Sequence, residues 1–327
     1  MLVNALGSLG QVSSATVASA LTGAGLWLDL GATVLRARSA VSGLSEQICT
    51  AYRHHPFNPD ATWADLHLTI GRAGGLRRWL RPQAIFECDD GRPFEPFPSA
   101  AALPLFEWSA NWLIGQRLNH LLLLHAGAAE KDGLALLMPA LPGSGKSTLT
   151  AALSLRGWRL LSDEFGAYDT TADRFHAVLK PVALKNESIE VIRQFSPNAL
   201  IGPKFPKTRK GTVAHLAAEP DAVARRHEAA RPGAFVLPRW QAGSSTRLEP
   251  LPPESLFGAL AFNAFNYKLL GIVGFDAVVG LTRRCPAWQL VYSDLADAIA
   301  AIDEIWPGVV AGHQSAGVAS AHSGSSR

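Results

Sequence analysis

The spacing of apolar residues divides the first part of the chain into strand-like and helix-like segments. Leucines alternate with other residues over 26–30 and the segment 33–38 follows, so this stretch predicts a pair of strands. Apolar residues with helical spacing over 105–118 predict a helix that leads into an apolar strand. The first 25 residues are small and weakly patterned, and we expect a loose start there.

The pattern changes beyond residue 118. Two apolar strands, 121–129 and 134–140, are joined by a Lys-Asp-Gly turn and run into a glycine-rich loop. A helix over 146–155 and a further strand over 158–162 follow. Strand, glycine-rich loop, helix and strand is the order of a nucleotide-binding unit, so the sequence predicts an α/β fold.

We expect three parts in the chain. Residues 1–118 would form a smaller α+β domain and residues 119–307 the domain with the glycine-rich loop, in keeping with a length of 327 residues. Residues 308–327 are mostly glycine, serine, alanine and histidine, and such a segment has too little apolar surface to pack. It therefore predicts a disordered tail.

Composition excludes several classes of protein. Hydrophobic residues make up 48% of the chain and charged residues 17%, which predicts a sizeable core. The formal charge of +3 is too small to support nucleic-acid or membrane-surface binding, and no apolar run approaches the ~18 residues of a membrane span. Three widely separated cysteines, and a first cation only at Arg36, favour a protein of the reducing cytoplasm without a secretory signal.

The sharpest chemical signal is the segment Ala140-Leu-Pro-Gly-Ser-Gly-Lys-Ser-Thr148, which matches the pattern G-x-x-x-x-G-K-[ST] except for alanine at the first position. Glycines let backbone N–H groups wrap phosphate oxygens, Lys146 supplies positive charge, and Ser147 supplies a hydroxyl for Mg²⁺. The residues expected to bind ATP or GTP are Pro142, Gly143, Ser144, Gly145, Lys146, Ser147 and Thr148. An ordinary flexible loop is the alternative, which the strand before it and the helix after it disfavour.

Side chains suited to the same chemistry lie nearby in the sequence. Asp163 and Glu164 end the strand 158–162, and carboxylates in that position hold Mg²⁺ or act as a base. Solvated loop carboxylates are the alternative. His125 lies in the first apolar strand, where a structural hydrogen bond is the more common role.

Cations downstream of the loop are candidate phosphate or substrate contacts. Lys185 could neutralise a transferring phosphoryl group, or stand in water at the end of a strand. Residues 204–211 hold four cations, among them Arg209 and Lys210, between a proline and a glycine. Such a loop could close over bound phosphate, and a solvated surface loop is the alternative.

A helix is predicted over 256–270. Its apolar face comprises Phe262, Phe265 and Leu269. Asn263 and Asn266 are neighbours on the helix surface because they are three residues apart. They could contact substrate, although polar residues that border a core helix need no such role.

Three segments of the chain together resemble bacterial HPr kinase/phosphorylase. They are His125-Ala-Gly-Ala, the glycine-rich loop with the strand before it, and Arg156-Gly-Trp-Arg-Leu-Leu-Ser-Asp-Glu164. Their order is similar to the family's His-Gly strand, its Gly-x-Ser-Gly-x-Gly-Lys-Ser loop and its Arg-Gly-His-Arg-Leu-Val-Ala-Asp-Asp segment. The resemblance covers about residues 120–170, and the chain looks most like the branch of HPr-kinase-related kinases (type A).

The resemblance implies an α/β P-loop kinase domain of the HPr kinase and phosphoenolpyruvate carboxykinase type, with ATP and Mg²⁺ as cofactors. By it, Asp163 would take the proton from a serine hydroxyl and His125 would support that aspartate. The implied catalytic residues are Asp163, His125 and Lys146, and the implied metal ligands are Ser147 and Glu164.

Two positions depart from the family. Glu164 replaces the family's second aspartate, which keeps a carboxylate but changes its reach. The family's downstream Glu-x-Arg-Gly-x-Gly segment is missing, and residues 179–187 stand in its place. The second departure puts HPr as the substrate, and the reverse phosphorylase reaction, in doubt.

The leading hypothesis is a cytoplasmic ATP-dependent kinase that transfers the γ-phosphoryl group to a hydroxyl, with serine of a protein or ribosomal peptide as the expected acceptor. Residues 1–118 would recruit that acceptor. The resemblance also implies a small peptide-chaperone-like partner and a homo-oligomer. The alternatives are a small-molecule kinase of the same fold and an ATP-binding, non-catalytic module of a peptide-modification system.

Overall fold

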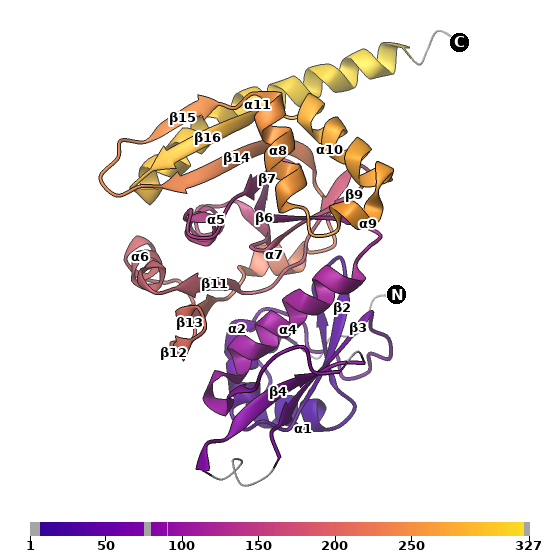
Figure 1. Cartoon of the computed structure of the whole chain (residues 1–327), viewed down its shortest axis with the longest axis vertical. Coiled ribbons are helices and arrows are strands. Elements are labelled where there is room, and N and C mark those ends of the chain that lie inside the picture. The colour runs from indigo at the N-terminus through magenta and orange to yellow at the C-terminus, as the bar shows by residue number, and fades with distance from the viewer. Residues whose placement is uncertain (1–6, 75–79, 90, 324–327) are drawn as a thin grey trace. The chain divides into compact units, whose positions relative to one another are not determined.

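The computed structural model describes residues 7–74, 80–89 and 91–323, with their side chains as far as residue 315. The chain divides into two compact units, and most of their elements are labelled in Figure 1. Unit 1 comprises Met1–Leu118 and Ala177–His227, and unit 2 comprises Asn119–His176 and Glu228–Arg327. Both units combine helices and strands, so the chain is a mixed α/β protein.

Unit 1 contains two sheets. The first has the strand order β1-β2-β3-β4-β5, in which only the β2–β3 pair is parallel. Its strands are β1 (Leu26–Asp29), β2 (Val34–Ser39), β3 (Leu66–Arg72), β4 (Gln83–Glu87) and β5 (Phe97–Pro98). The second is antiparallel in the order β11-β13-β12, with β11 (Val182–Lys185), β12 (Phe205–Thr208) and β13 (Gly211–Leu216).

The helices of unit 1 are α1 (Ser14–Thr22), α2 (Leu44–Ala51), α4 (Ala102–Arg117), α6 (Glu187–Phe195) and α7 (Pro220–Ala224), with a 3-10 turn at Ser99–Ala101. α1 lies where the weak pattern predicted a loose start. The Ser13 hydroxyl accepts a hydrogen bond from the Thr16 N–H at 3.1 Å and caps this helix, while Val17 and Leu21 are buried. Capping and two buried side chains thus order a segment that has little amphipathic pattern of its own.

The segment 177–227 packs within unit 1, although the sequence grouped it with the C-terminal domain. Lys180 Nζ lies 2.9 Å from Oε2 of Glu107 on α4, and Oε1 of the same carboxylate accepts a hydrogen bond from the Tyr52 hydroxyl at 2.6 Å. All three side chains are buried. Because a buried charge needs a partner, this network ties the segment to α4.

Unit 2 is built on an eight-stranded mixed sheet in the order β10-β9-β6-β7-β14-β16-β15, with β8 also paired to β6. β14 is parallel to β7 and β16, and the other pairs are antiparallel. The strands are β6 (Leu122–Lys131), β7 (Leu134–Pro139), β8 (Arg159–Ser162), β9 (Phe165–Asp169), β10 (Arg174–His176), β14 (Arg231–Trp240), β15 (Arg247–Pro250) and β16 (Ala287–Tyr292). The helices are α5 (Lys146–Ser154), α8 (Pro253–Asn263), α9 (Tyr267–Leu270), α10 (Ile272–Arg284) and α11 (Leu295–Ser323).

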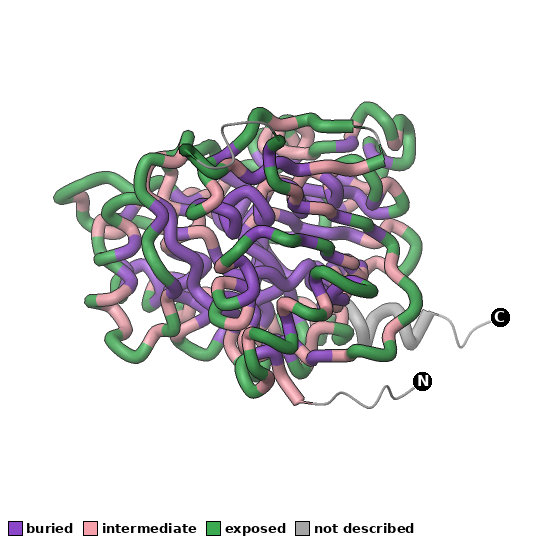
Figure 2. Tube along the Cα trace, turned by 90° about the horizontal axis from the view of Figure 1, so that it is seen from below, coloured by how far each residue is buried: buried purple, intermediate pink, exposed green. Residues whose placement is uncertain are grey.

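The core of unit 2 lies along its central strands. Every residue of β7 is buried, which means that both faces of this strand are covered. Both α5 and α8 pack against the central strands. In Figure 2 the buried residues form continuous runs in the interior and the exposed residues lie mostly at the periphery.

The helix predicted over 256–270 is interrupted in the structure. α8 ends at Asn263 and α9 begins at Tyr267, because the side chain of Asn266 turns toward β6. Its amide nitrogen donates to the Leu121 carbonyl at 2.8 Å and its oxygen accepts from the Leu123 N–H at 3.0 Å. Asn266 is buried, and its hydrogen bonds anchor the turn between α8 and α9 to the sheet.

The C-terminal helix α11 takes in much of the stretch 308–327 that the composition predicted to be a disordered tail. Val309 is buried, and His313 Nε2 lies 2.7 Å from the Pro232 carbonyl of β14. These contacts give the first part of that stretch a packing partner that its composition does not reveal. Residues 324–327 lie outside the described part of the chain. Across the described residues, no helix combines the length and apolar character that crossing a membrane requires.

Candidate functional site

The glycine-rich loop and the acidic pair lie at the same edge of the unit 2 sheet. β7 and β8 both run antiparallel to β6, which separates them, so they point in the same direction. The loop follows β7, and Asp163 and Glu164 follow β8. Because α5 connects these two strands, the crossover β7-α5-β8 brings both segments to the carboxyl ends of the strands, where α/β sheets bind ligands.

Glycines give the loop its conformation. Gly143 and Gly145 have φ values of +86° and +87°, which side chains disfavour. A side chain at Gly145 would also clash with the Tyr292 hydroxyl, which donates to the Gly145 carbonyl at 3.2 Å. Burial raises the pKa of Tyr292, so its hydroxyl stays a donor. The N–H of Trp240 donates to the Ser144 carbonyl at 2.9 Å and holds the loop from β14.

The start of α5 faces the loop. The Leu149 N–H donates to the Gly145 carbonyl at 3.0 Å and makes the first hydrogen bond of the helix. The N–H groups of residues 146–148 therefore have no carbonyl partner within α5. Together with the positive end of the helix, such N–H groups favour an anion. α5 itself lies directly on β6, since a side chain at Gly127 would clash with the Thr150 hydroxyl.

Lys146 is the first residue of α5 and its charge is buried. The residue is only 7% exposed, and its Nζ makes no hydrogen bond within the described chain. It pairs with Oε2 of Glu164 at 3.9 Å, which is too long for a hydrogen bond. A desolvated ammonium with hydrogen-bonding capacity to spare is suited to a bound phosphate oxygen.

Asp163 and Glu164 form the bend between β8 and β9. These two strands continue along β6, with Ala128 opposite Ser162 and His125 opposite Phe165. The Ser162 hydroxyl accepts from the N–H groups of Glu164 at 3.3 Å and Phe165 at 3.1 Å. Asp163 is buried, so it is not the solvated loop carboxylate that the sequence left open, whereas Glu164 is partly exposed.

Glu164 connects His125 with Lys146. Its Oε2 lies 3.2 Å from His125 Nε2, and both side chains are about a quarter exposed, at 26% for His125 and 22% for Glu164. The ring of Phe265 lies 5.5 Å from the imidazole, centroid to centroid. The structure therefore brings His125, Lys146 and Glu164 together. The resemblance implied that His125 supports Asp163, whereas in the structure its imidazole pairs with Glu164.

The residues at this edge fit a nucleotide with its metal. Backbone N–H groups and the buried Lys146 ammonium suit phosphate oxygens, and the Ser147 hydroxyl and Glu164 carboxylate are oxygen donors of the kind Mg²⁺ prefers. Among the described residues there is no group of three or more His, Cys, Asp or Glu side chains that could hold a metal by itself.

The three candidate cations outside the loop belong to unit 1. Lys185 ends β11, where its backbone N–H donates to the Ser188 hydroxyl at 2.7 Å. The guanidinium of Arg209 lies 5.7 Å from the ring centroid of Phe97, and the Lys210 ammonium lies 5.0 Å from that of Trp108. Cation–π contacts thus hold these two cations against aromatic side chains of their own unit.

A cluster of exposed apolar side chains was not expected from the sequence, which placed Phe262, Phe265 and Leu269 on a core face. In the structure these side chains are exposed, as are three further apolar side chains that follow closely in the sequence, and we call the six together the apolar patch. Its members are Phe262, Phe265, Leu269, Ile272, Val273 and Phe275, each between 45% and 77% exposed. The helix expected to carry Phe262, Phe265 and Leu269 is broken in the structure: Phe262 lies in α8, Phe265 in the turn after it and Leu269 in α9.

The two asparagines near the patch have structural partners. Asn266 is buried against β6, as described above, and the Asn263 side chain donates to the Ala259 carbonyl within its own helix at 2.8 Å. Both contacts agree with the interpretation that polar residues bordering this helix need no role in substrate binding.

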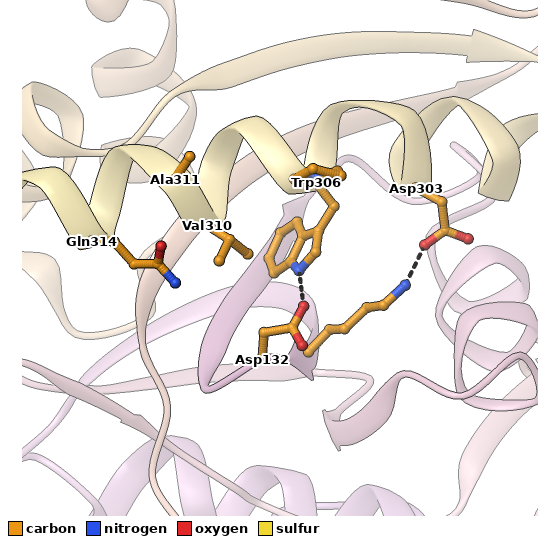
Figure 3. Close-up of a pocket in the computed structure, with 8 residues that line it drawn as sticks. Asp132, Asp303, Trp306, Val310, Ala311 and Gln314 are labelled. Carbon is orange, nitrogen blue, oxygen red and sulfur yellow. Dashed lines mark hydrogen bonds and ion pairs between the residues drawn. The ribbon is translucent and has the colours of Figure 1, made fainter.

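A pocket of about 380 Å³ lies at the opposite end of β7 from the glycine-rich loop, beside the β6–β7 turn and α11 (Figure 3). Its charged groups are already paired: Lys131 Nζ lies 2.7 Å from Asp303, and the Trp306 indole donates to Asp132 at 3.1 Å. The six residues of β7 separate the two ends of the strand by roughly 20 Å. The pocket is therefore separate from the loop site.

The chain matches no protein-family model, and no curated protein matches it.

Proposed function

We propose that the chain is an ATP-dependent phosphotransferase whose catalytic domain is a P-loop kinase domain similar to that of HPr kinase. The observation that supports this most is the position of Glu164 Oε2, 3.2 Å from His125 Nε2 and 3.9 Å from Lys146 Nζ, at the sheet edge that also holds the glycine-rich loop. A buried cation, an anion-binding helix start and adjacent carboxylates are the groups that phosphoryl transfer uses.

In this proposal the loop 142–148 binds the phosphates of ATP. Its backbone N–H groups and Lys146 neutralise the charge of the transferring group, while Ser147 and Glu164 would hold Mg²⁺, which draws charge from the β- and γ-phosphates. Most of the rate comes from positioning and electrostatics, because phosphoryl transfer asks the protein for little covalent chemistry.

Asp163 is the proposed base. It accepts the proton of the acceptor hydroxyl as that oxygen bonds to the γ-phosphorus, and the electron pair of the breaking P–O bond leaves with ADP. His125 is a positioning residue in this scheme, because its contact with Glu164 holds that carboxylate beside Lys146.

A polypeptide is the proposed acceptor. A small-molecule kinase would need a compact polar pocket beside the loop to hold its substrate. What lies against His125 instead is Phe265, one member of the exposed apolar patch. Large apolar side chains exposed close to a site are typical of protein or peptide docking, so we infer an acceptor with apolar residues near the reacting serine. A small peptide-chaperone-like protein could present such a peptide.

The test is phosphate transfer from γ-labelled ATP by the full chain with Mg²⁺. Acceptors would be HPr and the peptides encoded beside the gene, with and without any small chaperone-like protein encoded there, and products would be resolved by mass spectrometry. We expect one added phosphate on a peptide serine, and none when EDTA removes the metal. Transfer to HPr would show that HPr is a substrate although the family's downstream segment is missing. Bound ATP without transfer to any acceptor would contradict the kinase proposal and favour the non-catalytic module.

A further inference from the structure

Trp240 stands directly beside the glycine-rich loop. It is the last residue of β14, the strand parallel to β7, so it lies at the sheet edge where the loop begins. Its N–H donates to the Ser144 carbonyl at 2.9 Å, and a side chain at Gly145 would lie 3.0 Å from its Cβ.

The indole ring of Trp240 is hydrogen-bonded at one edge and is partly exposed to solvent. Its Nε1 donates to the Ser293 carbonyl at 3.2 Å, which anchors one edge of the ring. The residue is nevertheless 49% exposed, although a large aromatic residue contributes most to stability when it is buried. A ring fixed at one edge and open to solvent is prepared for stacking, since it loses little conformational freedom when a second ring binds.

We propose that Trp240 is the stacking platform for the nucleobase of the bound nucleotide. The inference rests on the proposed function, because it needs the phosphates to occupy the loop 142–148. With the phosphates there, the ribose and base must extend past the loop, and Trp240 offers an aromatic surface next to Ser144 and Gly145. Stacking recognises the face of a base and not its hydrogen-bonding edge, so ATP and GTP should bind within a few fold of each other.

The experiment compares the affinities of the full chain for ATP and for inorganic tripolyphosphate by isothermal titration calorimetry. The variants are Trp240→Leu, which removes the ring, and Trp240→Phe, which keeps a smaller one. Trp63→Leu is the matched control, because Trp63 is an exposed tryptophan of unit 1. We expect Trp240→Leu to weaken ATP binding about tenfold or more and to leave tripolyphosphate binding unchanged. Trp240→Phe should recover part of the loss, and the control should lose nothing.

The outcomes distinguish a failure of the stacking role of Trp240 from a failure of the proposed function. If the unmodified chain binds neither ATP nor tripolyphosphate, the proposed function itself fails. If it binds both and Trp240→Leu keeps the preference for ATP, the stacking role is overturned while the function stands. Equal losses for ATP and tripolyphosphate would also overturn it, because they would mean that Trp240 acts by shaping the loop.

Discussion

Nε2 of His125, in β6, lies 3.2 Å from Oε2 of Glu164, in the bend between β8 and β9. The contact joins a strand residue to the bend that also contains Asp163. Since Glu164 is engaged by His125 and Lys146, the two neighbouring carboxylates have different surroundings: Glu164 is partly exposed and Asp163 is buried. In the proposed function, this difference suits Glu164 to the metal and Asp163 to the acceptor hydroxyl.

Replacing the proposed base should separate chemistry from binding. Asp163→Asn keeps the size of the side chain and removes its proton-accepting charge, so ATP affinity should stay within a few fold while transfer is lost. Glu164→Gln is the comparison, because it keeps the base and weakens the metal site, and higher Mg²⁺ should recover part of its activity. Radiolabel transfer and calorimetry measure the two quantities. Turnover retained by Asp163→Asn would rule out its role as base.

The buried ammonium of Lys146 should cost stability in the absence of ligand. Lys146→Met keeps the length of the side chain and removes a desolvated charge that makes no hydrogen bond in the described chain, so we expect unfolding to become about 1 kcal/mol less favourable and Tm to rise about 2–4 °C. Nucleotide binding should be lost at the same time. Lys131→Met is the control, since Lys131 pairs with Asp303 at 2.7 Å and its removal should not raise Tm. Unchanged ATP affinity in Lys146→Met would contradict the phosphate-binding role.

The loop should depend on glycine at residue 145 for space as well as for φ. Gly145→Ala must strain the backbone at φ +87° and displace Tyr292, so nucleotide affinity should fall by at least tenfold. Gly157 has a similar φ of +90° but nothing within 4 Å of an added Cβ, so Gly157→Ala should cost only about 1 kcal/mol of stability and leave binding unchanged. Equal effects of the two variants on binding would show that contacts around Gly145 are unimportant.

The apolar patch should determine the affinity for a polypeptide acceptor. The double variant Leu269→Ser and Ile272→Ser removes two side chains that are 68% and 69% exposed, so the fold should keep its stability. We expect KM for the acceptor peptide to rise about thirtyfold while KM for ATP does not change, because each of the two lost apolar contacts contributes roughly 1 kcal/mol. Steady-state kinetics with either substrate varied would show this. An unchanged acceptor KM would place the docking surface elsewhere.

Two buried histidines should make unit 1 sensitive to acid. Burial lowers the pKa of His55 and of His215 from 6.5 to about 4. Between pH 6.5 and pH 4 the unfolded chain binds more protons than the folded one. The free energy of unfolding is therefore highest above pH 6.5 and falls as the pH drops toward 4. At pH 5 each histidine should cost about 2 kcal/mol.

Thermal unfolding from pH 7 to pH 4.5 measures this loss. His215→Phe should reduce the slope, because it removes one of the two titrating groups and keeps a ring near Phe205. A stability profile that is flat below pH 6.5, or unchanged by this substitution, would contradict the assignment.

Several elements followed from sequence because local pattern determines them. The apolar runs that became β6 and β7, the helix that became α5 and the strand that became β8 were all predicted in order. The loop was predicted because glycine at positive φ and an adjacent lysine are chemical requirements that a short segment meets by itself. The acidic pair was predicted from its place after a strand.

Other features depend on contacts between distant residues. The break between α8 and α9 follows from Asn266 reaching the backbone of β6, about 145 positions away in sequence. The residues predicted to form one core face lie on both sides of that break and are exposed. Trp240 was not singled out, because only the parallel pairing of β14 with β7 places it beside the loop.

The sequence by itself determined the order of strand, loop, helix and strand, and the chemical groups at their ends, because these depend on residues a few positions apart. The tertiary structure decided which groups meet: Glu164 between His125 and Lys146, Trp240 against the loop, and residues 177–227 within unit 1. The physical reason is that burial and hydrogen bonding across a sheet select among arrangements that local pattern leaves equally open.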